Sequence, residues 1–318
     1  MFDCHYDLLT YLLMKRKEIP FIKKYCKKVY HQENIKGGIF NLFYMSEEEM
    51  HNEIGIEKEQ INIIENLKEV KDLLKQDIVS KDIQYYFGIE GLDYLEKIED
   101  MDILYDLGLR FTNPVWNHLN RFGSGVKGLE GQGLTKLGEQ LIDKLVDKKI
   151  GIDVSHANEK TFYDIVKRCE AWRIKGKNPI VFASHSNAKA VCNVPRNLTD
   201  KQIQEIVGLG GTIGVVSIKR FCDERQEVTD RSRNYRKEYI KHINYIRDLL
   251  GGVDAICVAT DDMSYYSMEP EYYQNANVYP HDKVAKWLKE DLQKEGYTQK
   301  QIEDIFWNNF HTKILARI

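Results

Sequence analysis

The chain of 318 residues is predicted to fold as one α/β domain, a (β/α)8 barrel of the TIM type with a metal site at the carboxyl ends of its strands. Eight short apolar segments alternate with longer amphipathic segments, and the length suits a single barrel. No internal repeat or Pro/Gly/Ser-rich linker divides residues 1–318. An open doubly wound sheet is the rival prediction, but no G-x-G-x-x-G motif follows any predicted strand.

The predicted strands recur from the N-terminus onward, and each is a short apolar run rich in β-branched and aromatic residues. They span residues 2–9, 38–45, 83–91, 107–113, 149–157, 179–186, 210–218 and 255–262. Parallel strands need crossover connections, which the intervening segments are long enough to supply.

Amphipathic helices are predicted between the strands. Residues 133–149 contain Thr135, a predicted N-cap, and after it an apolar stripe lies on one face. The stripe consists of Leu137, Leu141, Leu145 and Val146. A second helix is predicted over residues 200–210 with Asp200 as its cap, and residues 282–318 hold one or two more.

The composition argues against several classes of partner. Lys plus Arg number 46 and Asp plus Glu number 49, so the net charge of −3 creates no field for nucleic acid or an anionic membrane. There is no apolar run of transmembrane length and no signal-peptide pattern, so a cytoplasmic protein is expected. The six cysteines lack C-x-x-C spacing, which predicts reduced, buried thiols.

Histidine and carboxylate side chains stand at or near the ends of five predicted strands. In the first strand, His5 and Asp7 share a face because residues i and i+2 of a strand point the same way. The further candidates are Glu90, His156, His185 and Asp261. The carboxyl ends of barrel strands surround one mouth, so these side chains would converge there. Their mixed nitrogen and oxygen donors suit a divalent ion such as zinc.

Two of these histidines are predicted to face inward. His156 shares its strand parity with Ile152 and Val154, and His185 shares its parity with Val181. A buried imidazole needs a hydrogen-bond partner or a metal, since unpaired polar burial costs about 1–3 kcal/mol. The remaining histidines are predicted to lie on the surface: His31, His51, His118, His242, His281 and His311.

The ordered motifs resemble the membrane (renal) dipeptidase family of binuclear zinc peptidases, in its bacterial cytosolic branch. The resemblance runs from residue 3 to the C-terminus. It rests on "DCHYD", "GIEG", "LGLRFTNPVWNHLN", "GLTKLGEQLIDKLVDKKIGIDVSH", "SHSNAKAVCNVPRNLTD" and "GVDAICVATDDMS", which occur in the family's order. The closing "QIEDIFWNNFHTKIL" is similar to the family's terminal helix.

This resemblance implies a zinc-dependent dipeptidase that hydrolyses short peptides through a metal-bridging hydroxide. His5 and Asp7 would hold one zinc ion, His156 and His185 a second, and Glu90 would bridge both. Two Zn²⁺ per chain are implied, with Mn²⁺ or Co²⁺ as alternatives. Such a pair of ions lowers the pKa of the shared water and polarises the scissile carbonyl.

The resemblance also implies residues that bind substrate. Arg196 matches the position that binds the substrate carboxylate, and the fixed fork of a guanidinium suits a planar anion. Asp261 matches the acid that meets the free amino group and assists proton transfer. Asn197 would orient the Arg196 loop or serve only as a turn residue. Trp307 and Phe310 would pack on the barrel or on a second subunit, and a homodimer is expected by analogy with the family.

Three departures from the family pattern leave the substrate open. Trp116 stands where the fullest catalytic set has a histidine, and an indole can only donate a hydrogen bond. Loss of one oxyanion donor costs about 2.7–4 kcal/mol in the transition state. Tyr6 replaces an asparagine, and Asp262 in "TDDMS" would add a second carboxylate to the pocket. A metallohydrolase acting on another amide, lactam or N-acyl amino acid is therefore the alternative, and a non-catalytic metal-containing binding protein is a further one.

Overall fold

The computed structural model describes residues 1–44, 61–224, 234–262, 264 and 275–318. Within them, six parallel strands form one sheet in the order β1-β2-β3-β4-β5-β6, and β7 pairs in parallel with β8. The strands are β1 (Phe2–Tyr6), β2 (Gly37–Phe43), β3 (Gln84–Glu90), β4 (Leu109–Asn113), β5 (Gly151–Asp153), β6 (Val181–Phe182), β7 (Ile213–Val216) and β8 (Ile256–Ala259). Each of the eight predicted segments coincides with one of these strands, although β2 begins at Gly37, one residue before the second segment, and Met45 at the end of that segment lies outside the described residues.

Contacts at both edges connect the two sheets. Ala183, directly after β6, forms a parallel bridge with Ile213 of β7. At the other edge, the backbone N–H of Asp261 donates to the carbonyl of His5 at 3.0 Å. The N–H of Thr260 donates to Asp3 Oδ1 at 2.8 Å, so the end of β8 is attached to β1. The parallel strands therefore curl toward one another, as in a TIM-like α/β fold.

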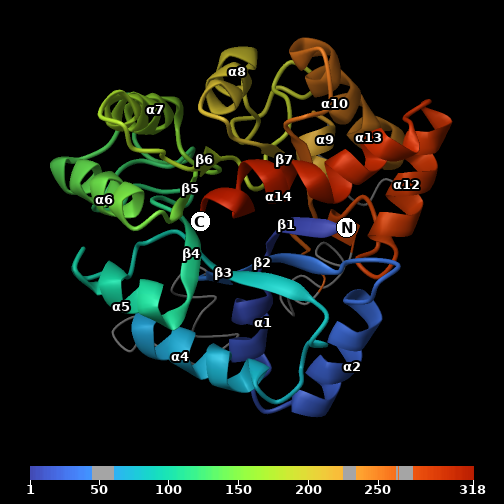
Figure 1. Cartoon of the computed structure of the whole chain (residues 1–318), viewed down its shortest axis with the longest axis horizontal. Helices are drawn as coiled ribbons and strands as arrows, with labels where there is room; N and C mark the ends of the chain where they lie inside the picture. The colour runs from blue at the N-terminus through green and yellow to red at the C-terminus, as the bar shows by residue number, and fades with distance from the viewer. Residues whose placement is uncertain (45–60, 225–233, 263, 265–274) are drawn as a thin grey trace.

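Helices surround the strands, as Figure 1 shows. They are α1 (Leu8–Met14), α2 (Ile19–Val29), α4 (Ile63–Leu74), α5 (Asp100–Leu107), α6 (Lys136–Asp147), α7 (Glu159–Ile174), α8 (Asp200–Gly208), α9 (Lys219–Cys222), α10 (Tyr235–Leu250), α12 (Val284–Lys294), α13 (Gln299–Glu303) and α14 (Asn309–Lys313). A π-helical turn, Asp304–Asn308, joins α13 to α14, and a short 3-10 turn, Leu315–Arg317, ends the chain. No helix in these described ranges combines the length and apolar character needed to cross a bilayer.

The predicted cap of α6 is confirmed, and that of α8 is wrong by one residue. Thr135 Oγ1 accepts a hydrogen bond from the N–H of Gly138 at 3.0 Å. The cap of α8 is Thr199, which forms a reciprocal capping box with Gln202. Asp200 is instead the first helical residue, where its negative charge favours the positive end of the helix dipole.

Aromatic rings close the face of the molecule where the strands begin. Phe310 of α14 lies with its ring centroid 4.9 Å from that of Phe2, 5.7 Å from Phe182 and 5.9 Å from Phe111. Trp307 packs edge-on against Phe2, with the centroids 5.7 Å apart. The tail therefore packs on the strands of its own chain, and Figure 1 shows α14 across this face. The six cysteines are buried and free, as predicted.

Replacing Phe310 by alanine should destabilise the fold by about 3–5 kcal/mol, because its side chain is only 1% exposed and fills the space between three strands. Phe21→Ala provides a matched control, since that ring on α2 is 54% exposed. Urea unfolding measures both variants. A loss for Phe310→Ala no larger than the loss for Phe21→Ala would contradict this role of the terminal helix.

Candidate active site

The predicted ligands lie together at the carboxyl ends of the strands. His5 belongs to β1, and Asp7 follows directly after that strand. The others end a strand or follow it: Glu90 (β3), His156 (β5), His185 (β6) and Asp261 (β8). All are buried except Asp261, which is partly exposed. The predicted convergence of residues from distant parts of the sequence is therefore present in the fold.

Glu90 occupies the centre of this cluster. Its Oε1 lies 2.8 Å from His156 Nε2 and 3.2 Å from His185 Nε2. Its Oε2 lies 3.4 Å from His5 Nε2, which in turn is 3.5 Å from Asp7 Oδ1. The two carboxylate oxygens therefore face two different groups of side chains. Among the described residues, three groups of potential metal ligands have close donor atoms. One comprises Glu90, His156 and His185, a second His5, Asp7 and Asp261, and a third His5, Asp153 and His185.

The outer nitrogens of the imidazoles have protein partners. His156 Nδ1 lies 2.9 Å from the amide oxygen of Asn117. Nδ1 therefore carries the proton, and Nε2 keeps its lone pair. Ser184 Oγ lies 2.6 Å from His185 Nδ1 and 3.1 Å from His5 Nδ1. Partners of this kind orient metal-binding histidines in proteins. The three Nε2 atoms are thus directed at Glu90.

Two buried aspartates fix the backbone beneath the ligands in the same way. Asp153 Oδ1 accepts hydrogen bonds from the N–H groups of Ser155 and Ser184, each at 2.9 Å, and thereby joins the ends of β5 and β6. Asp3 Oδ1 accepts from the N–H groups of His5 at 3.3 Å and Thr260 at 2.8 Å, which joins β1 to β8. Although Asp153 is near His5 and His185, these hydrogen bonds make it a support for the site rather than a ligand.

The donors present fit a divalent cation. His5 Nε2 and Asp7 Oδ1 are buried and, within the described residues, have no hydrogen-bond partner. Burial raises the pKa of Glu90 to about 7. Burial also lowers the pKa values of His156 and His185 well below the usual value, which keeps both imidazoles neutral. Neutral imidazoles beside carboxylates that lack solvation are the donor set that a metal such as zinc requires.

Two of the site residues have strained backbones. His156 has φ of 70° and Asp261 has φ of 45°, in the left-handed region that residues with a Cβ seldom adopt. Asp261 is held there from both sides, because its own N–H bonds to His5 and the preceding Thr260 is bonded to Asp3. Strain of this kind is commonly found at functional sites.

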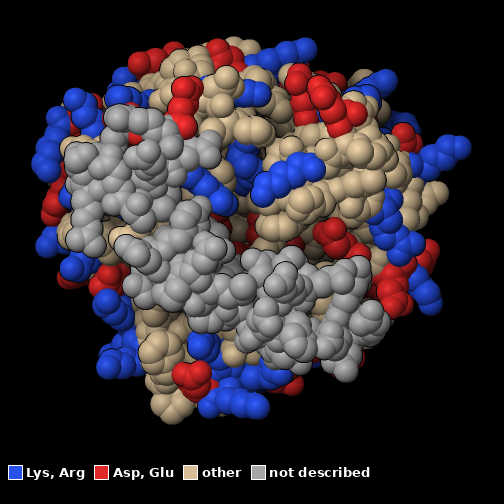
Figure 2. All heavy atoms as spheres, turned by 180° about the vertical axis from the view of Figure 1, so that it is seen from behind, with Lys and Arg blue, Asp and Glu red and all other residues tan. Residues whose placement is uncertain are grey.

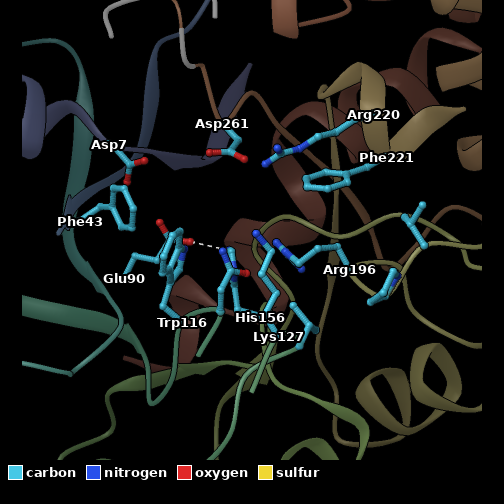
Figure 3. A pocket seen from close by; sticks show the side chains of 14 residues that line it. Asp7, Phe43, Glu90, Trp116, Lys127, His156, Arg196, Arg220, Phe221 and Asp261 are labelled. Carbon is cyan, nitrogen blue, oxygen red and sulfur yellow. Dashed lines mark hydrogen bonds and ion pairs between the residues drawn. The ribbon is translucent and has the colours of Figure 1, made fainter. Parts of the chain in front are cut away.

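A cavity of about 280 Å³ opens beside the cluster. It is lined by Asp7, Phe43, Glu90, Trp116, Asn117, Val126, Lys127, His156, Val194, Pro195, Arg196, Arg220, Phe221 and Asp261. Trp116 is therefore at the cavity wall, as predicted, with its ring centroid 5.8 Å from that of His156. Figure 3 shows Asp7 and Glu90 on one side of the cavity and Arg196 and Arg220 on the other. The cavity is thus electrically polarised.

Arg196 and Asn197 have different surroundings. The Arg196 side chain is 9% exposed, and its Nη2 donates to the carbonyl of His185 at 3.2 Å. Asn197 is not a lining residue, and its Nδ2 donates to the carbonyls of Cys192 at 2.8 Å and Phe221 at 2.9 Å. Asn197 therefore attaches the Arg196 loop to α9, which agrees with an orienting role.

Three sequence predictions are wrong in this region. Asp262 does not line the cavity; its Oδ2 accepts from Tyr25 Oη at 3.0 Å and lies 3.4 Å from His281 Nδ1. His281, expected at the surface, is buried, and the neighbouring negative charge of Asp262 helps raise its pKa to about 9 despite burial. His242 is also buried and accepts from the N–H of Ala188 at 3.2 Å. His118 and His311 are exposed, His31 is partly exposed, and His51 lies outside the described residues.

Sequence reasoning missed several residues that shape the site. They are Asp153, Asn117, Ser184, Lys127, Arg220 and Phe221. Arg220 had a usable signal, since "KRF" directly follows the seventh predicted strand at the carboxyl edge. Asp153 also ends a strand, but nothing in one sequence distinguishes a support for the ligands from a ligand.

The whole chain matches one known family. A family model described as membrane dipeptidase, peptidase family M19, matches residues 2–317. The chain belongs to this family. Membership makes it a metallopeptidase of the dipeptidase class, and a peptide substrate follows from that class.

Related sequences and structures agree with this M19 assignment. A protein from the pqqA 5' region of Klebsiella pneumoniae is 32% identical over 244 residues, which cover 74% of this chain and 82% of that protein. An uncharacterized dipeptidase of Schizosaccharomyces pombe is 24% identical over 239 residues, which cover 74% of this chain and 54% of that protein.

Two solved structures share the fold. One is a metallopeptidase from Rhodobacter sphaeroides bound to a phosphinate mimic of the dipeptide L-Ala-D-Ala. It has a TM-score of 0.75 and 21% identity, with coverage of 100% of this chain and 99% of that chain. The other is dipeptidase AC, an M19 metallopeptidase, with a TM-score of 0.75 and 20% identity. The match covers 99% of this chain and 97% of that chain.

The strain at Asp261 leads to a stability prediction for this M19 member. Asp261→Gly should be more stable than Asp261→Ala by about 1 kcal/mol, because only glycine adopts a φ of 45° without steric cost. At the exposed helical position Lys167 of α7, the order should reverse, with alanine about 1 kcal/mol better than glycine. Chemical unfolding of the four variants measures both differences. Alanine being the more stable residue at position 261 would show that the backbone there is unstrained.

Proposed function

We propose that this M19 member is a zinc-dependent dipeptidase with two metal ions in one site. In this proposal His5 and Asp7 hold one ion, His156 and His185 hold the other, and Glu90 bridges them. The observation that carries the proposal is the orientation of Glu90. Its Oε1 faces His156 and His185, whereas its Oε2 faces His5. The eight parallel strands are taken as a (β/α)8 barrel that presents these ligands at one mouth.

The residues around the cavity would bind a dipeptide at its two charged ends. Arg196 donates hydrogen bonds to the terminal carboxylate, because its guanidinium faces the cavity and its Nη2 is held by the His185 carbonyl. Asp261 binds the free amino group on the acidic side. A third residue would misplace one of these charges, so the site selects substrates of two residues.

Proton transfer falls to Asp261 in this scheme. Its carboxyl group lines the cavity beside the candidate ligands His5 and Asp7, a position suited to a group that exchanges protons with bound substrate. The divalent ions supply a water of lowered pKa and a Lewis acid for the scissile carbonyl. Asp261 receives a proton as the nucleophile attacks and delivers it to the leaving amine.

Trp116 supports a second candidate function. An indole N–H at the cavity wall donates a hydrogen bond but transfers no proton. Hydrolysis of a strained lactam, whose amide is already activated, makes less demand on oxyanion stabilisation and would suit it, and an N-acyl amino acid is the other candidate substrate. Turnover of L,L- and L,D-dipeptides, compared with lactams and N-acyl amino acids, separates the two candidates.

Glu90→Gln should weaken metal binding at both positions by at least about tenfold, because the bridging carboxylate contributes to both groups of ligands. Metal analysis of the purified protein without this substitution should give about two metal equivalents per chain. Glu69→Gln is the matched control, since that side chain is 45% exposed and pairs with Arg16 far from the cavity. Two equivalents retained by Glu90→Gln would refute the bridge.

Asp261→Asn should reduce kcat for dipeptides by about 100-fold or more while leaving the metal content unchanged, because it removes the proton carrier but preserves the side-chain shape. Steady-state kinetics and metal analysis are measured on the same preparation. Loss of metal would instead identify Asp261 as a ligand, and unchanged turnover would exclude it from proton transfer.

A further inference from the structure

Two residues at which this chain departs from its family's motifs, Tyr6 and Asp262, belong to one chain of hydrogen bonds outside the cavity. Tyr6 Oη donates to Tyr25 Oη at 3.2 Å, and Tyr25 Oη donates to Asp262 Oδ2 at 3.0 Å. His281 Nδ1 lies 2.8 Å from the same tyrosine oxygen and 3.4 Å from Asp262 Oδ2. Because the one proton of the Tyr25 hydroxyl is directed at Asp262, His281 Nδ1 is the donor to Tyr25. We call Tyr6, Tyr25, Asp262 and His281 the Asp262–His281 network.

This network lies under the surface, on the side of the fold where the strands end. Tyr6, Asp262 and His281 are 0%, 3% and 6% exposed. Figure 2 shows this side of the molecule, where Lys and Arg atoms border a hollow, whereas Asp262 and His281 are buried. Apolar side chains of similar volume are often as stabilising as a buried ion pair. The stability of the fold alone therefore does not account for the pairing of Asp262 with His281.

The other ring nitrogen of His281 faces the residue that precedes Asp261. His281 Nε2 lies 3.4 Å from Thr260 Oγ1 and 3.7 Å from Asp3 Oδ2. Thr260 Oγ1 donates to Asp3 Oδ2 at 2.5 Å, and Asn277 Nδ2 donates to the Thr260 carbonyl at 2.7 Å. One imidazole therefore contacts both Thr260 and Asp262, the two neighbours of Asp261 in the sequence.

Asp261 is the residue between these two attachments. Its φ of 45° is in the left-handed region, and its side chain lines the cavity, whereas that of Asp262 does not. Figure 3 shows the Asp261 carboxylate at the cavity, with the Arg220 side chain directed toward it. A strained backbone persists only where the surrounding contacts hold it in place. The contacts of His281 with Thr260 and Asp262 act on both sides of Asp261.

The segment that carries His281 is itself fixed. Asn34 Nδ2 donates to the carbonyl of His281 at 2.9 Å, and Asn34 Oδ1 accepts from the N–H of Ala285 in the first turn of α12 at 3.1 Å. Asn34 is 2% exposed, so these hydrogen bonds are shielded from water. The imidazole of His281 is therefore held at a fixed place against the end of β8.

We propose that His281 and Asp262 are positioning residues that hold the carboxylate of Asp261 at the cavity. Neither residue lines the cavity, so both act through the backbone on either side of Asp261. This inference rests on the proposed function, in which Asp261 binds the substrate amino group and transfers a proton. The second carboxylate of "TDDMS" then positions the first one instead of binding the substrate.

Two mild substitutions test the network. Tyr25→Phe removes the hydroxyl that connects His281 to Asp262, and Asp262→Asn removes the negative charge while keeping the shape of the side chain. Tyr30→Phe is the matched control, because its ring centroid lies 6.1 Å from that of His281 and its buried hydroxyl has no hydrogen-bond partner within the described residues. Urea unfolding identifies the conditions under which all three variants are folded.

Hydrogen exchange measures the positioning without metal or substrate. The N–H of Asp261 is bonded to the carbonyl of His5, so its exchange reports how firmly the end of β8 is held. Tyr25→Phe and Asp262→Asn should each speed this exchange by about tenfold, and Tyr30→Phe should leave it unchanged. Exchange at Asp261 that is the same in all three variants would overturn the positioning role.

Kinetics test whether the network acts through Asp261. Tyr25→Phe and Asp262→Asn should each lower kcat/KM for Ala-Ala by about tenfold or more at unchanged metal content, because a displaced carboxylate transfers a proton poorly. In the Asp261→Asn background the same substitutions should lower the remaining activity by less than about twofold, since no proton carrier is left to misplace. Equal losses in both backgrounds would reveal a general structural effect and contradict the proposal.

Binding separates this inference from the proposed reaction. Calorimetry compares a phosphinate mimic of Ala-Ala with the same molecule lacking its amino group. Tyr25→Phe and Asp262→Asn should weaken binding of the first by about tenfold and of the second by less than about twofold, because only the first has an amino group for Asp261. If this selective loss occurs but no dipeptide is hydrolysed, the positioning of Asp261 stands and the proposed reaction fails. Equal effects on the two mimics would contradict the positioning role.

Discussion

The desolvated carboxylate of Glu90 is the constraint on which this site depends. The residue is 5% exposed and faces three imidazole nitrogens, so its negative charge has little access to water. A buried charge is tolerated only where opposite charge or hydrogen bonds compensate it. His156 and His185, whose pKa values burial lowers, leave their Nε2 lone pairs in the same space, and a divalent cation satisfies both kinds of group at once.

The rest of the mouth can be understood as support for that arrangement. Asp3 and Asp153 each accept two backbone N–H groups and thereby join the ends of strands that bear ligands. Ser184 and Asn117 orient imidazoles from outside. These contacts are polar and buried, so each is costly to leave unpaired, and together they restrict the ligands to one geometry.

Much of this organisation could be predicted from the sequence, because it follows from local patterns. Apolar runs of strand length located all eight strands, and polar residues at the ends of those runs located the side chains proposed as ligands. The positions of Asp262 and His281 could not be predicted. Their burial depends on contacts among three segments that are distant in the sequence: α2, the residues after β8, and the loop before α12. Likewise, a buried Asp153 has the same local signal as a ligand, and only its hydrogen bonds separate the two roles.

The brevity of β5 and β6 has a consequence for how such enzymes diversify. Regular pairing in this part of the sheet ends at Asp153 and Phe182, before His156 and His185 are reached. Side-chain hydrogen bonds, rather than the ladder, then keep the imidazoles in place. Segments beyond these anchors can change in length and composition over evolutionary time without moving the hydrolytic centre, so substrate range can drift while the chemistry persists.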